Sequence, residues 1–274
     1  MRTMRAPAAA ALSLLLWLGA RTGIARLPAL RPAFLLLGTL GCLIPALLHF
    51  MRKKKRRRTP LVHPGRPEAA HLYQSVRVGA LFVFPALLAR DAMAAALRLP
   101  TENVTQNDVF LLPALLFSLL SAFSEGLFYR GWLEAALSGR RKAVQILLPA
   151  ALFALSGASL TRALPRLALG ILLSGIARRH RSLASSMAAH AAFLMTLCVL
   201  EAAGLGGGRL TPLSAGILLA GCFFFYAALL GCFRLAPTGE DLVLSRPRFT
   251  RREGALLALG LCALILAPIL LEVL

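Results

Sequence analysis

Long apolar segments recur along the whole chain, separated by short stretches rich in Arg, Lys, Pro and Gly. A run of about 18 or more apolar residues is long enough to cross a bilayer as a helix. The sequence does not show the period-2 alternation that is typical of transmembrane barrel strands. Backbone N–H and C=O groups in lipid must form hydrogen bonds within the protein, which helices achieve within each segment. The pattern therefore predicts an all-α, polytopic transmembrane helical bundle of about 8–9 spans. The candidate spans are residues 6–20, 32–51, 76–97, 109–137, 143–159, 164–177, 182–203, 211–233 and 254–273.

The distribution of polar residues divides the chain into three parts. Residues 1–58 form an N-terminal two-span hydrophobic unit that ends in a basic cytoplasmic run, and residues 59–75 are a Pro-rich linker. Residues 76–274 form the membrane helical bundle. The first span is short and follows MRTMR, so it is either a signal-like segment or a retained anchor. Without a clear small-residue cleavage site we favour the anchor, and eight spans is the alternative count.

The charge of the chain lies mostly between the spans. The 274 residues are 58% hydrophobic with a mean hydropathy of +0.73, against about 45–50% apolar residues in soluble domains. A net charge of +20 first suggests nucleic acid, but the positive-inside rule accounts for where the charge lies, so no nucleic-acid partner is expected. Alternating topology puts 22 of the 31 basic residues inside and 7 outside. An integral membrane protein follows, and the Ala-, Leu- and Arg-rich composition favours a bacterial inner (plasma) membrane.

The basic run RKKKRRR, from Arg52 to Arg58, sets the cytoplasmic side. It is also a possible site for anionic lipid, because each juxtamembrane charge attracts anionic headgroups by about 1 kcal/mol. The five cysteines lie in or beside apolar runs without a CxxC pair, so they predict buried thiols and no disulfide framework.

Ionisable residues inside the third, fourth and seventh spans are the candidates for function, because each costs about 2.5–3.5 kcal/mol to insert. Arg90 and Asp91 are adjacent and point about 100° apart on a helix, so we expect them not to pair with each other. One of them pairs across helices, or the third span breaks there. Glu201 lies near the outer end of the seventh span.

The fourth span carries three charged residues. Arg130 and Glu134 are four apart and predict a local ion pair, whereas Glu125 and Arg130 are about 140° apart around a helix. Glu125 is then left without a local partner, and His190 is the only histidine well inside a span. Such a carboxylate and imidazole can activate a water as a general base in a dry cavity, or they can form a hydrogen bond that only joins two helices.

Three segments in order resemble the motifs of the CPBP family, the CAAX-processing and bacteriocin-processing proteases. EGLFYRG resembles the first motif, Glu-Glu-x-x-x-Arg, and LLPAALFALSGASL resembles the second, Phe-x-x-x-His. LALGILLSGIARRHRSLASSMAAHAAFL resembles the third, in which a Gly-rich helix and a basic turn precede His-x-x-x-Asn. The resemblance covers a core at about residues 110–200.

The resemblance implies a polytopic membrane endopeptidase and gives roles to four residues. Glu125 matches the water-activating glutamate and His190 matches the histidine of the third motif, so both are candidate catalytic residues. Arg130 matches the motif arginine and Phe153 matches the phenylalanine of the second motif, and both are expected to support the site.

The chain departs from the family pattern at three positions. The second glutamate is replaced by Gly126, the histidine of the second motif falls on Gly157, and the asparagine of the third falls on Leu194. Glu134 can replace the lost glutamate as the partner of Arg130. We expect Gly157 to leave a void in a polar cavity shared by the candidate pair, so that Gly157→His would raise activity.

The family is often described as metal-dependent, but we expect no metal or other cofactor here. Zinc takes three or four ligands from His, Cys or carboxylate, and the alignment leaves only Glu125 and His190. Ser156, Ser159 and Thr161 are candidate hydrogen-bond donors rather than ligands, and His180 is expected to be solvated in a cytoplasmic turn.

Three functions remain open from the sequence. The first is a divergent CPBP/CAAX-type intramembrane endopeptidase, in which a glutamate-activated water attacks a peptide bond of a membrane-associated protein or peptide. The second is a pseudoprotease that binds or scaffolds a membrane protein partner without cutting it. The third is a transporter component, in which the carboxylate–imidazole pair relays protons.

Overall fold

The computed structural model describes residues 39–40, 42–43, 46, 68–99, 111–137, 140–157, 159–205 and 212–234. The predicted spans 6–20 and 254–273, nearly all of 32–51, the run from Arg52 to Arg58 and most of the linker lie outside the described residues. The predicted lipid site and the count of 8–9 spans therefore stay predictions.

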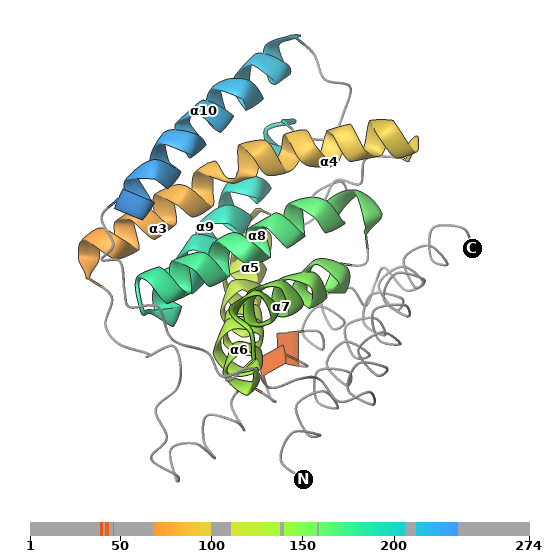
Figure 1. Cartoon of the computed structure of the whole chain (residues 1–274). Helices are drawn as coiled ribbons and strands as arrows, with labels where there is room; N and C mark the ends of the chain where they lie inside the picture. Colours follow the sequence, from red (N-terminus) through yellow and green to blue (C-terminus); the bar gives the residue numbers. More distant parts are fainter. Residues whose placement is uncertain are drawn as a thin grey trace.

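Every regular element of the described part is helical, with no strand among these residues (Figure 1). The elements are α3 (Ala69–Leu81), α4 (Val83–Leu97), α5 (Leu111–Glu125), η2 (Gly126–Leu133), α6 (Glu134–Ala136), α7 (Lys142–Ser156), α8 (Leu160–Arg179), α9 (Leu183–Ala202) and α10 (Pro212–Arg234). Six predicted spans thus correspond to helices, and the first of these begins at Ala69 rather than at residue 76. The all-helical fold predicted from the sequence is confirmed for this part.

Within the described residues, four helices are long and apolar enough to cross a membrane, and the chain is an integral membrane protein. They are Ala69–Leu97, Leu160–Arg179, Leu183–Ala202 and Leu213–Cys232. Helix α10 exposes large apolar side chains, as expected of a lipid-facing helix. These include Leu213, Leu219, Phe223, Phe224 and Tyr226.

Small residues bring the helices that carry the site close together. A β-carbon at Gly79 of α3 would collide with the backbone of Ala189 in α9. A β-carbon at Gly170 of α8 would lie 2.9 Å from Ala150 of α7. Small residues permit such approaches between membrane helices. Because α3 covers α9 at Ala189, the next residue, His190, is directed toward other neighbours.

Helices α7 and α8 form a hairpin, side by side in Figure 1. Its first helix has 15 residues and is therefore about 22 Å long, less than the hydrocarbon thickness of about 30 Å. The turn at Gly157 consequently lies at bilayer depth when the first residue, Lys142, lies at the interface. This geometry brings the polar end of α7 into the interior of the bundle.

The segment after α5 is a π-helix, in which backbone hydrogen bonds join residues five apart. It begins at Gly126, immediately after Glu125, and ends at Leu133. Side chains that are four apart therefore do not align here as they would on an α-helix. This change of phase decides which partners Arg130 and Glu134 find.

The turn between α8 and α9 is packed rather than solvated. His180 is 8% exposed, and its ring stacks on His71 of α3 with centroids 4.5 Å apart. Its Nδ1 is 3.1 Å from Ser75 Oγ, and its Nε2 is 3.7 Å from Cys232 Sγ at the end of α10. The expectation of a solvated His180 was wrong, because the ends of α3 and α10 cover the turn.

Candidate active site

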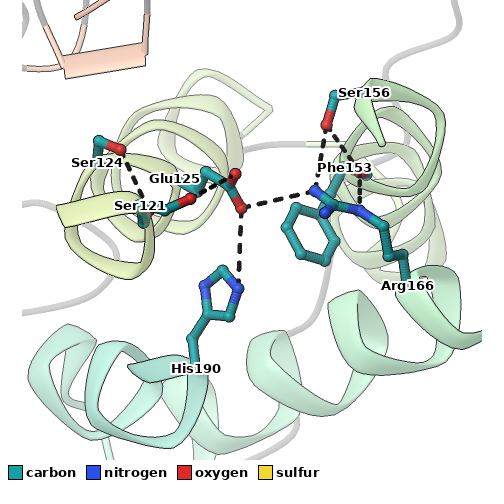
Figure 2. A network of polar contacts seen from close by, with 7 residues as sticks. All are labelled: Ser121, Ser124, Glu125, Phe153, Ser156, Arg166 and His190. Atoms are coloured by element: carbon teal, nitrogen blue, oxygen red, sulfur yellow. Dashed lines mark hydrogen bonds and ion pairs between the residues drawn. The ribbon is translucent and has the colours of Figure 1, made fainter. Parts of the chain in front are cut away.

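Glu125 is the last residue of α5 and is buried. Ser121, one turn earlier, donates a hydrogen bond of 3.0 Å to its Oε1. Its Oε2 is 3.8 Å from His190 Nε2 and 3.6 Å from Arg166 Nη2, as Figure 2 shows. The expectation that Glu125 has no local partner was wrong, because Ser121 shares its helix face.

His190 reaches the carboxylate from α9. It is 1% exposed, and its ring meets Phe153 edge-on, with centroids 5.4 Å apart and an interplanar angle of 85°. The two candidate catalytic residues of the sequence are thus brought together, within the 3–6 Å at which a base role acting directly or through one water is geometrically possible. Leu194, one turn further along α9, packs against the apolar core and supplies no donor.

Phe153 of α7 is fully buried and contacts side chains of α8, α9 and η2. The guanidinium of Arg166 lies 4.3 Å from its ring centroid, and that of Arg130 lies 4.4 Å away. Cation–π contacts of this length are favourable, and more so when desolvated. The main-chain oxygen of Phe153 also accepts hydrogen bonds from Arg166 Nε at 3.2 Å and Ser156 Oγ at 2.8 Å.

The expected void at Gly157 does not exist. A β-carbon built there would lie 2.7 Å from Cδ and 2.9 Å from Nε of Arg166. The side chain of Arg166 enters from the second turn of α8 and takes the volume where the family pattern places a histidine. Ser156 contacts Arg166 Nη2 at 3.5 Å, whereas Ser159 and Thr161 hydrogen-bond to each other at 3.1 Å.

At Gly126, where the family pattern has the second glutamate, a neighbouring side chain also fills the space beside the glycine. A β-carbon at Gly126 would lie 2.5 Å from Cγ of Met187 in α9. A glutamate at this position would displace that side chain. The side chain of Met187 thus occupies the space that a second glutamate would need.

Arg130 and Glu134 do not form the predicted ion pair. Arg130 is directed toward Phe153, and its Nη1 and Nη2 have no hydrogen-bond partner within the described part of the chain. Glu134 is fully buried and accepts from Arg178 Nη2 of α8 at 3.1 Å. Gln145 accepts from the same Nη2 at 3.0 Å. The prediction failed because it assumed α-helical spacing, whereas this segment is a π-helix.

A second charged cluster joins α4 to α9. Arg90 Nη1 is 3.0 Å from Glu201 Oε1, and Arg90 Nη2 is 2.9 Å from Asp91 Oδ1. The cross-helix partner was expected, but the expectation that the adjacent Arg90 and Asp91 do not pair was wrong. A long arginine side chain can fold back along its own helix, so the angle between Cα–Cβ bonds does not decide the contact.

The side chains of the site do not fit a zinc ion. Among the described residues, no group of three or more His, Cys, Asp or Glu is arranged to hold a metal ion. The position of the second-motif histidine is filled by a guanidinium, which is a cation and no ligand.

The sequence did not single out Arg166, although it lies near the start of the predicted span 164–177. Two signals were available. Arg166 follows Pro165 within an otherwise apolar segment, and it lies nine residues after Gly157 across a short turn. Neither signal fixes the direction of the side chain, which the packing of α7 on α8 decides.

The described part is thus a helical membrane protein in which a carboxylate, an imidazole and a guanidinium from three helices meet. Residues 107–196 match the family model of Rce1-like proteins, described as type II CAAX prenyl endopeptidase Rce1-like. This segment contains every residue of the candidate site, and the match confirms the CPBP resemblance over about a third of the chain. No curated protein and no solved structure matches the chain.

Proposed function

We propose that the chain is a CAAX-type intramembrane endopeptidase in which Glu125 activates the attacking water. The observation that carries the proposal is the buried contact of 3.8 Å between Glu125 Oε2 and His190 Nε2 inside the family-matched segment. This separation is longer than a direct hydrogen bond. One water that is hydrogen-bonded to both groups fits a separation of this size, as general-base catalysis requires.

The reaction follows from the positions of these groups. The carboxylate of Glu125 takes a proton from the water, and the water oxygen attacks the carbonyl carbon of the peptide. The carbonyl electron pair moves to oxygen and gives a tetrahedral oxyanion. Collapse of the oxyanion breaks the C–N bond, and Glu125 returns its proton to the leaving nitrogen. His190 holds the water, and Ser121 holds the other carboxylate oxygen.

The substrate in this proposal is a membrane-associated protein or peptide. The candidate groups belong to helices inside the bundle, and α7 ends at bilayer depth. A peptide bond that reaches them must be close to the membrane, as in a lipid-anchored tail. From composition, we place the protein in a bacterial inner membrane.

A pseudoprotease is the second candidate, and two contacts favour it. Arg166 Nη2 lies 3.6 Å from Glu125 Oε2, where it takes space that an attacking water would need, and Met187 closes the position of the second glutamate. A site closed in this way can bind a peptide segment without hydrolysing it.

Cleavage in proteoliposomes tests the proposal, with an internally quenched, farnesylated peptide that ends in a CAAX sequence as the probe. We expect Glu125→Gln to lower kcat about 100- to 10,000-fold, the range for loss of a general base. The matched control is Glu68→Gln, an exposed carboxylate at the start of α3, which should cleave as the wild type does. Equal cleavage by the Glu125→Gln and wild-type proteins would reject the mechanism. Binding of the peptide without cleavage by either form would establish the pseudoprotease.

A further inference from the structure

Arg166 is the most exposed of the three groups that meet in the site. Its side chain is 23% exposed, whereas those of Glu125 and His190 are 3% and 2% exposed. Figure 2 shows its guanidinium between the carboxylate and the end of α7. A substrate carbonyl that enters from the exposed side of the site would therefore lie close to this cation when it reaches Glu125.

The guanidinium is held in place by several contacts. Nε donates to the main-chain oxygen of Phe153 at 3.2 Å, and Nη2 lies 3.5 Å from Ser156 Oγ and 3.6 Å from Glu125 Oε2. The ring of Phe153 lies 4.3 Å beneath it. A guanidinium has five N–H donors. These contacts with described residues use Nε and Nη2, which leaves the two N–H groups of Nη1 for an oxygen of the substrate.

We infer that Arg166 is a catalytic residue that stabilises the oxyanion of the tetrahedral intermediate. The inference rests on the proposed function and specifies which group receives the charge. As the water adds to the carbonyl carbon, negative charge moves to the carbonyl oxygen, and a fixed guanidinium within the site lowers the energy of that state. Gly157 and Leu194 cannot supply such a donor, and Arg166 occupies the volume beside Gly157.

An oxyanion role and a purely structural role predict different kinetics. An oxyanion donor acts on the transition state, so its loss lowers kcat with little change in KM. A group that only joins α8 to α5 would instead change the thermal stability. Loss of the donor can also be repaired from solution, because free guanidinium can enter the space that a smaller side chain leaves.

The experiment measures kcat and KM for the farnesylated, internally quenched CAAX peptide. The full chain is placed in liposomes of phosphatidylethanolamine and phosphatidylglycerol. We expect Arg166→Ala to lower kcat about 100- to 1,000-fold, the usual effect of removing one oxyanion donor. Arg166→Lys should retain part of the activity, and millimolar guanidinium should partly restore Arg166→Ala. The matched control is Arg162→Ala, one turn earlier on α8, which should cleave as the wild type does.

Each other result rejects the inference in a recognisable way. If Arg166→Ala keeps the wild-type kcat while Glu125→Gln is inactive, the glutamate mechanism stands and the role of Arg166 is wrong. If Arg166→Ala is inactive and neither lysine nor guanidinium restores it, the contact is structural. If the wild type does not cleave, or if Glu125→Gln cleaves equally well, the proposed function and this inference are both rejected.

Discussion

At Gly157, a side chain from the next helix fills the volume that a β-carbon would need. Arg166 Cδ and Nε would lie 2.7 and 2.9 Å from such an atom. When a motif residue is missing, a side chain from another part of the sequence can fill its place in the folded protein. The replacement here changes an imidazole into a cation and brings that cation next to Glu125.

This contact predicts the effect of Gly157→His. The substitution should not raise activity. It should overpack the site and cost about 1–3 kcal/mol of stability. In an Arg166→Ala background the same substitution should cost less, because the space is then free. Thermal unfolding of the wild type, both single variants and the double variant in detergent measures this coupling. Strictly additive effects would contradict the predicted contact between positions 157 and 166.

At the scale of the elements, the π-helix η2 determines which residues of other helices contact Glu134 and Arg130. Glu134 pairs with Arg178 of α8, and Arg130 packs on Phe153 of α7. The C-terminal end of η2 and the start of α6 are thereby attached to the C-terminal end of α8, whereas Arg166 lies near the N-terminal end of that helix. One helix thus contributes both a contact in the site and a support for the segment that carries it.

The pairing of Glu134 predicts a specific energetic coupling. Arg178→Ala leaves a buried carboxylate without its cation, and we expect a loss of about 3 kcal/mol, at the low end for broken buried pairs because Arg178 is partly exposed. A double-mutant cycle of Arg178→Ala with Glu134→Gln should give a larger coupling than a cycle of Arg130→Ala with Glu134→Gln. Arg141→Ala, at an exposed position before α7, is the control for loss of a cation. A larger coupling energy between Arg130 and Glu134 would contradict this prediction and support the ion pair expected from α-helical spacing.

At the scale of the whole molecule, one polar cluster joins elements that are far apart in the sequence. His71 and Ser75 of α3, His180 of the α8–α9 turn and Cys232 of α10 lie in contact. Burial lowers the pKa of His180 from 6.5 to about 4, with smaller contributions from His71 and Arg179. The imidazole is therefore neutral in the folded protein at neutral pH.

This lowered pKa gives a sign to the pH dependence of stability. Between pH 6.5 and about 4 the unfolded chain binds a proton at His180 that the folded protein does not bind, so stability falls as the pH falls through this window. His180→Phe keeps a stacking ring, and Ser75 Oγ keeps its hydrogen bond of 2.7 Å to the main-chain oxygen of His71. The Tm of the His180→Phe variant in detergent should depend less on pH than the Tm of the wild type. An equal dependence in both proteins would show that other groups cause it.

Much of the fold followed from the sequence because its signals are local. The length and hydrophobicity of a segment decide whether it can cross a bilayer, and six predicted spans lie on helices. The cost of a charge in lipid is also a property of the residue itself, so Glu125 and His190 stood out without any structure. Their meeting followed because each needed a partner within the bundle.

The tertiary structure alone decided the rest of the site. The direction of Arg166 depends on the close approach of α7 and α8 at Gly170, and the partners of Glu134 and Arg130 depend on the π-helix. The burial of His180 depends on the ends of two distant helices. Composition and spacing do not contain these facts, because a long side chain can reach several neighbours, and packing between helices selects the one that it contacts.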